Sequence, residues 1–235
     1  MVTTLRIDSR FRGPPTSGNG GYVAGLLAER LGGSDCQVTL HKPPPLDRDL
    51  ELRFDGADRS LWDGDDLIAA AKPAVVKVEP PPPPDLIAAE AASARFAGHT
   101  GHVFPDCFVC GPERMVGDGL RIFAGPLGPT MVTAPWQPSS DLCDYDGVLR
   151  ARFLWAALDC PGYFAVQDRS GPAVLGRFAV HVEHWPRCDR PLVVAGWPIS
   201  SDGRKHHAAT ALYADKRVVA VGHAIWISLE AQLSD

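Results

Sequence analysis

Apolar residues recur at helical spacing in two separate stretches of the chain. The first stretch carries them at Tyr22, Val23, Leu26, Leu27 and Leu31. The second carries them at Leu149, Phe153, Leu154, Ala157 and Leu158. Gly32-Gly33 should end the first helix, and Pro161 should interrupt the second. Short apolar runs separated by polar turns follow each stretch, so each half of the chain is predicted to be a helix and then antiparallel strands.

The strand patterns of the two halves match each other. Val38-Thr39-Leu40 aligns with Val180-His181-Val182, 142 residues later, and without a gap Leu50 then falls on Leu192. A second block aligns Leu61-Trp62 with Leu212-Tyr213, 151 residues later. The larger separation corresponds to one longer loop. Two blocks in the same order, each following a helix, indicate a duplicated structural unit.

A run of five prolines, Pro80 to Pro84, separates the halves. Such a run is stiff and extended and is typical of a linker. We therefore predict an N-terminal unit at residues 1–79, a linker with a short helix at residues 80–98, and a C-terminal unit at residues 99–235. The fold class is α+β, with one helix against a curved antiparallel sheet in each unit.

Three motifs carry a resemblance to a known superfamily. Asn19-Gly20-Gly21 resembles the start of the central helix in hotdog-fold acyl-CoA thioesterases. Cys107-Phe108-Val109-Cys110-Gly111-Pro112 resembles the opening segment of many single-hotdog proteins, and Ala156-Ala157-Leu158-Asp159 resembles their helix with its acid. The resemblance, to PaaI-type and TesB-type proteins, implies a double hotdog. It also implies an acyl-CoA or acyl-carrier thioester as substrate.

The resemblance implies a site shared by the two units. In hotdog thioesterases a glycine N–H at the helix start of one unit polarises the carbonyl, and an acid on the other unit's helix activates water or attacks. Here the first unit has Gly21 but Ala28 at the acid position. The second has Asp159 but Ala151 in place of a glycine. One composite site, Gly21 with Asp159, is expected, and the opposite site should be inactive. Glu29, one residue out of register, is a rival acid.

Further residues are assigned to this site by the same resemblance. His223 stands at a strand position where related proteins carry a catalytic side chain. Asn19 and Gly20 are expected to place the substrate. The acyl tunnel is expected between the two helices, lined by Tyr22, Leu26, Phe153 and Trp155.

Other interpretations stay open. Asp159 could be an N-cap before Pro161, and Asn19-Gly20-Gly21 could be a turn without a ligand. The protein could be a non-catalytic acyl or lipid-binding hotdog, or a dehydratase that uses His223 with Asp159. His99, His102, Cys107 and Cys110 could hold zinc in an interaction module. Their spacing is short for such a loop, so we expect neither a metal nor another cofactor.

Charge and composition exclude other classes of protein. The 235 residues carry a net charge of −5, and their basic residues are scattered, so neither a nucleic acid nor a membrane surface is an expected partner. The N-terminus lacks the apolar core of a signal peptide, which predicts a cytoplasmic location. The six cysteines are therefore expected to be reduced thiols. A homodimer of double hotdogs is one assembly that the resemblance allows.

Overall fold

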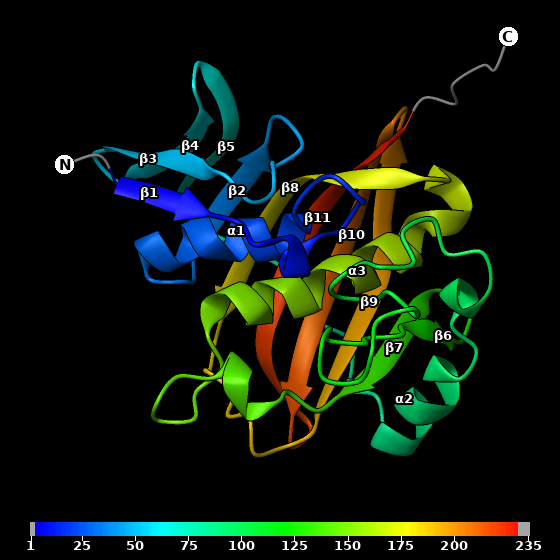
Figure 1. The fold of residues 1–235 in the computed structure, drawn as a ribbon. Helices are drawn as coiled ribbons and strands as arrows, with labels where there is room; N and C mark the ends of the chain where they lie inside the picture. Colours follow the sequence, from blue (N-terminus) through cyan, green and yellow to red (C-terminus); the bar gives the residue numbers. More distant parts are fainter. Residues whose placement is uncertain (1–2, 230–235) are drawn as a thin grey trace, which may run out of the picture.

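A computed structural model describes residues 3–229 of the chain (Figure 1). The N-terminal half contains β1 (Thr3–Arg6), α1 (Gly20–Ala28), β2 (Cys36–Leu40), β3 (Asp49–Asp55), β4 (Asp58–Asp63) and β5 (Asp66–Pro73). Then follow α2 (Leu86–Ser93), β6 (Gly125–Leu127), β7 (Met131–Trp136), α3 (Ala151–Ser170), β8 (Ala173–Val182), β9 (Leu192–Asp202), β10 (Lys205–Ala214) and β11 (Arg217–Ser228). Short 3₁₀ helices lie at Ser9–Phe11, Glu29–Leu31, Ala97–His99 and Ser140–Leu142.

Within residues 3–229 the eleven strands form one antiparallel sheet, and ten of them are arranged symmetrically about the β2–β8 pair. The order is β1-β3-β4-β5-β2-β8-β11-β10-β9-β7-β6. Outward from the centre, the succession β2-β5-β4-β3-β1 corresponds to β8-β11-β10-β9-β7, and β6 is an additional strand at one edge. At this pair Gln37 lies opposite Ala179, which is 142 residues later. Residues related by a two-fold axis face each other at the axis. The sheet therefore has a pseudo-two-fold axis where the sequence repeat puts it.

The outer strands follow the second offset. Leu61 pairs with Ala69 between β4 and β5, and Leu212 pairs with Ala220 between β10 and β11. Both pairs of strands shift register at the same place, after Leu61 and after Leu212. The predicted α+β double hotdog is thereby confirmed. The boundaries at residues 79, 80, 98 and 99 stay predictions.

Helices α1 and α3 lie side by side on one face of the sheet (Figure 1). A Cβ atom on Gly25 would lie 2.5 Å from Arg152 Cα, so the absence of a side chain lets the two backbones approach closely. The prediction that Pro161 interrupts the second helix is wrong, because α3 runs unbroken from Ala151 to Ser170. Asp159 is therefore inside a helix, and the alternative that it caps a new segment is also wrong.

The other face of the C-terminal sheet is covered by the segment between the halves. Ala89 of α2 is fully buried there, with Val76 and Val78 packed beside it against Ala211 and Tyr213. The Tyr213 hydroxyl donates to the Pro81 carbonyl at 2.9 Å. Both faces of these strands are consequently buried. Among the described residues, no helix has the length and apolar character that crossing a membrane requires.

Two of the six cysteines are not free thiols. Cys143 and Cys188 form a disulfide with their Cα atoms 6.4 Å apart. The bond joins the segment before α3 to the loop between β8 and β9. The expectation that all six are reduced is wrong for this pair, while Cys36, Cys107, Cys110 and Cys160 are free and buried.

Candidate active site at one end of the helix pair

The start of α1 meets the middle of α3 through one carboxylate. Asp159 Oδ2 accepts a hydrogen bond from the Gly21 backbone N–H at 2.9 Å and another from Asn19 Nδ2 at 2.9 Å. Asn19 is also the N-cap of α1, because its Oδ1 accepts the Tyr22 N–H at 2.9 Å. A Cβ atom on Gly21 would lie 2.4 Å from Asp159 Cβ, so only glycine allows this approach. The structure brings together the two residues that the sequence paired.

The Asp159 carboxyl group lies in a buried environment. Asp159 is 1% exposed, and its Oδ1 atom is buried without a hydrogen-bond partner among the described residues. Burial raises the pKa of this carboxyl to about 7, although the hydrogen bonds from Gly21 and Asn19 act in the opposite direction. A carboxyl group with such a pKa can both accept and return a proton near neutral pH.

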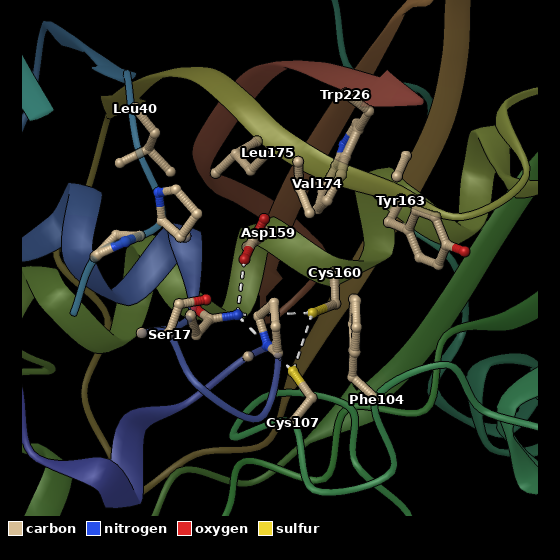
Figure 2. A pocket seen from close by; sticks show the side chains of 18 of the residues that line it. Ser17, Leu40, Phe104, Cys107, Asp159, Cys160, Tyr163, Val174, Leu175 and Trp226 are labelled. Carbon is tan, nitrogen blue, oxygen red and sulfur yellow. Dashed lines mark hydrogen bonds between the residues drawn. The ribbon is translucent and has the colours of Figure 1, made fainter. Parts of the chain in front are cut away.

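An apolar cavity of about 500 Å³ opens beside this carboxylate (Figure 2). Asn19, Gly20 and Asp159 line it at one side, and the remaining wall is mainly apolar, formed by Leu40, Phe104, Tyr163, Val174, Leu175 and Trp226. In Figure 2 the Asp159 oxygen that has no dashed line points toward Val174 and Leu175. The volume lies within the range of roughly 300–1,000 Å³ that is usual for small-molecule sites.

The first two N–H groups of α1 differ in their partners. The first N–H groups of a helix have no partner within that helix. The Gly21 N–H already donates to Asp159, whereas the Gly20 N–H has no hydrogen-bond partner within residues 3–229. Gly20 lines the cavity and Gly21 does not. The Gly20 N–H is therefore available to a carbonyl oxygen, at the positive end of the helix dipole.

Three buried thiols adjoin the carboxylate. The sulfur atoms of Cys107, Cys110 and Cys160 lie within 4.8 Å of one another, and all three residues line the cavity. Hydrogen bonds from the Cys110 and Cys160 thiols lower the pKa of Cys107, while burial raises the pKa of Cys110. These residues form the one group of potential metal ligands that the described part of the chain contains.

The opposite end of the helix pair has a different arrangement. There the Arg152 backbone N–H donates to Glu29 Oε1 at 3.1 Å, and its guanidinium donates to both oxygens of the same carboxylate. Trp185 packs against Gly33 close by. A salt bridge and a large aromatic side chain thus lie at this end of the helix pair. The rival acid Glu29 is held in an ion pair.

The structure places three of the expected site residues elsewhere. Side chains alternate along β11, and Gly222 and Ala224, on either side of His223, face α3. His223 therefore projects from the opposite face of the sheet. There its Nε2 lies 3.2 Å from His207 Nδ1. Tyr22 stacks on Phe11 with ring centroids 4.1 Å apart. Trp155 is fully buried and donates to the Gly33 carbonyl at 2.9 Å.

The expected tunnel is also misplaced. Neither Leu26 nor Phe153 lines the cavity, which lies beyond the helix start rather than between the helices. Close contact at Gly21 and Gly25 leaves no room between α1 and α3. The cavity is formed instead by the segments at residues 13–20, 40–44 and 102–110, together with the first residues of β8 and the last residues of β11.

The four candidate zinc ligands are likewise not brought together as a set. His99 Nε2 lies 3.1 Å from the Ser93 carbonyl, away from the thiols. Cys160, from a distant part of the sequence, takes its place beside Cys107 and Cys110. Its position directly after Asp159, on the helix that carries the site, is the one sequence signal that could have found it.

Comparison with known proteins supports the architecture. No protein-family model matches the sequence, and a comparison with curated proteins gave no match. Among solved structures, a tesB protein of Mycobacterium avium subsp. paratuberculosis matches with a TM-score of 0.59 and 15% identity over 92% of this chain and 89% of that one. A protein assigned as a thioesterase II of Thermobifida fusca matches with a TM-score of 0.60 and 16% identity over 95% and 91%. The chain therefore has the double hotdog fold of these TesB-type and thioesterase II proteins along nearly its whole length.

Proposed function

We propose that the protein hydrolyses acyl thioesters, of coenzyme A or an acyl carrier, at one composite site between its two hotdog units. The observation that carries the proposal is the Asp159 carboxylate in the wall of an apolar cavity, with one oxygen fixed by Gly21 and Asn19 and the other without a partner. The folds of the TesB-type and thioesterase II proteins agree with this choice of reaction.

In the proposed mechanism the acyl chain lies along the apolar wall, and the thioester carbonyl accepts a hydrogen bond from the Gly20 N–H. Asp159 Oδ1 removes a proton from a water molecule as the water oxygen attacks the carbonyl carbon. The tetrahedral intermediate collapses with cleavage of the carbon–sulfur bond. The leaving thiolate takes the proton from Asp159, giving a carboxylic acid and a free thiol. Gly21 and Asn19 hold the Asp159 carboxylate in place throughout.

The test is hydrolysis of a panel of short, long and aromatic acyl-CoA substrates, followed by chromatography of free coenzyme A. Thiol-reactive dyes are unsuitable because the protein has free cysteines of its own. Asp159→Asn preserves the size of the side chain but removes the base. We expect it to lower kcat at least about 100-fold, within the usual contribution of a general base.

A matched control comes from the same helix. Asp168→Asn makes the identical chemical change at an exposed position near the end of α3. We expect this variant to retain wild-type turnover. Equal activity of the wild type and Asp159→Asn would contradict the assignment of the base, and no turnover of any panel member would contradict the proposed reaction.

One observation favours a second function, non-catalytic acyl binding. Asp159 Oδ2 is already bonded to the Gly21 N–H, so the carboxylate also ties the two helices together. A binding protein would retain affinity for acyl-CoA, measured by calorimetry, and release no thiol. The dehydratase alternative loses its expected histidine because His223 projects from the other face of the sheet.

A further inference from the structure

The three thiols beside the cavity come from two distant segments. Cys107 and Cys110 belong to the loop between the 3₁₀ helix at Ala97–His99 and β6, and Cys160 belongs to α3. Each residue is at most 6% exposed. The proposed hydrolysis uses none of them. Three buried thiols in one place therefore need a separate explanation.

Their spacing fits a single soft metal ion. Zinc binds thiolate sulfur at about 2.3 Å, so two sulfurs on a tetrahedral ion stand roughly 3.8 Å apart. Cys107 Sγ and Cys160 Sγ are 3.8 Å apart, and all three sulfurs lie within 4.8 Å of one another. A disulfide would use only two of these thiols and leave the third without a role.

The surroundings of Cys107 support a thiolate. Asn19 Nδ2 donates to Cys107 Sγ at 3.9 Å and to Cys160 Sγ at 3.9 Å. The Gly111 N–H donates to the Cys107 carbonyl at 2.8 Å. A Cβ atom on Gly111 would lie 2.4 Å from the Pro105 carbonyl oxygen, so the turn requires glycine. N–H groups directed at a sulfur stabilise its negative charge, which a metal ligand must carry.

A metal ion at these thiols would cross-link the long segment from Thr100 to Ala124 to α3. This segment contains neither a helix nor a strand, and loops longer than about 12–15 residues without secondary structure are uncommon in compact domains. Cys107, Cys110, His102 and Phe104 of this segment all line the cavity. An ion shared with Cys160 would fix this wall to α3.

His102 supports the thiols from outside the ligand set. Its Nδ1 accepts the Phe104 N–H at 2.9 Å, so in the neutral ring the hydrogen is on Nε2. Nε2 lies 3.3 Å from Cys110 Sγ and donates to it. Hydrogen bonds of this kind orient ligands and adjust the charge on a metal centre.

We propose that Cys107, Cys110 and Cys160 bind one zinc ion through their thiolates, with His102 as a hydrogen-bond donor to Cys110. Binding releases three thiol protons to solvent. The fourth coordination position is left to a molecule from the cavity, because all three cysteines line it. Three protein ligands and an open position are the arrangement in which zinc holds water or a substrate atom.

The test is the metal content of the full chain, purified from zinc-supplemented cells without chelators and measured by plasma mass spectrometry. We expect about one zinc per chain in the wild type and near none in Cys160→Ala. The control is Cys36→Ala, which removes a buried free thiol of β2 outside the group and should keep the zinc. His102→Phe should weaken zinc binding roughly 10-fold to 100-fold, measured by competition with a chelator.

Cobalt gives a second readout that does not require a variant to fold. Co²⁺ added to chelator-treated wild type should produce thiolate-to-cobalt charge-transfer bands and the visible bands of a tetrahedral ion. Two results overturn the proposal: a wild type whose zinc content equals that of a chelator-treated sample with no cobalt spectrum, or a Cys160→Ala variant with undiminished zinc. Neither measurement depends on turnover, so failure of this proposal is distinct from failure of the hydrolase.

Discussion

The two ends of the α1–α3 pair are related by the pseudo-two-fold axis, yet they have opposite contents. The Gly21 N–H meets Asp159 beside an open cavity, whereas the equivalent Arg152 N–H meets Glu29 within a closed ion pair. At both ends a carboxylate accepts a hydrogen bond from a backbone N–H at the start of a helix, where the N–H has no partner within its own helix. At Asp159 one oxygen has no partner, while the Arg152 guanidinium occupies both oxygens of Glu29.

This difference separates structural from chemical requirements at a helix crossing. A carboxylate at either end holds the two helices together. The end without a guanidinium keeps an oxygen available for a proton, and the cavity of about 500 Å³ lies at that end.

Gly25→Ala should disrupt both ends together. The new Cβ would lie 2.5 Å from Arg152 Cα and 3.0 Å from the Arg152 carbonyl oxygen, which are backbone atoms that cannot rotate away. Overpacking of this kind typically costs about 1–3 kcal/mol, and we expect the upper part of the range. Urea denaturation measures the loss. The control is Ala28→Gly, which lies on the same helix. A glycine such as Gly64 would not serve as a control, because its positive φ would strain any added side chain. A stability loss for Gly25→Ala no larger than that of Ala28→Gly would contradict the close crossing.

Glu29→Gln should affect stability but not turnover. The substitution removes the charge that pairs with Arg152, whose side chain is 30% exposed, and leaves the guanidinium poorly matched. We expect a loss of about 1–2 kcal/mol in the free energy of unfolding. Turnover per folded molecule should equal that of the wild type. A fall in kcat comparable to that of Asp159→Asn would show that the closed end takes part in the reaction.

Asn19→Ala should affect both stability and turnover at the open end. It removes the N-cap hydrogen bond to Tyr22 and the donor to Asp159 Oδ2. Loss of a cap costs about 1 kcal/mol. Because a hydrogen bond to the charged form lowers a carboxyl pKa, its loss should raise the pKa of Asp159 further. Asp159 acts as a base only when it is deprotonated, so the acidic limb of the activity profile should move to higher pH. Denaturation and a pH–rate profile measure the two effects, and Asn19→Asp restores the cap but not the donor. An unchanged profile in Asn19→Ala would contradict the positioning role.

Arg150→Asn should give the smallest effect and the opposite sign. Arg150 is the N-cap of α3 but makes no side-chain capping hydrogen bond, unlike Asn19 of α1. Asparagine at this position should increase the free energy of unfolding by about 0.5–1 kcal/mol. Turnover should stay unchanged, because Arg150 does not line the cavity beside Asp159. Thermal denaturation measures the gain, and a destabilised variant would contradict the equivalence of the two helix starts.

Much of the architecture could be predicted from the sequence because the repeat is encoded in local patterns. Alternating apolar residues gave the strands, and the separation of 142 residues recurs as the Gln37–Ala179 pairing in the sheet. The pairing of Gly21 with Asp159 was expected from the resemblance to hotdog thioesterases, whose site is shared by two units, and the structure brings the two residues into contact.

The failures concern features that depend on contacts between distant segments. The face on which His223 lies could not be read from β11, because the linker covers the outer face and both faces of the strand are apolar. The tunnel was misplaced because pattern alone does not reveal how closely Gly21 and Gly25 bring the helices together. Neither the approach of Cys160 to Cys107 nor the Cys143–Cys188 bond has a signature in local spacing.

The symmetric order of the sheet has a genetic consequence. In an assembly of two identical chains, every substitution appears at both ends of the helix pair, so a carboxylate gained or lost at one end is gained or lost at the other. Here the β2–β8 junction joins two halves encoded separately in one chain. A mutation therefore alters one end at a time, and one half can accumulate changes that favour folding while the other keeps its residues under selection for chemistry.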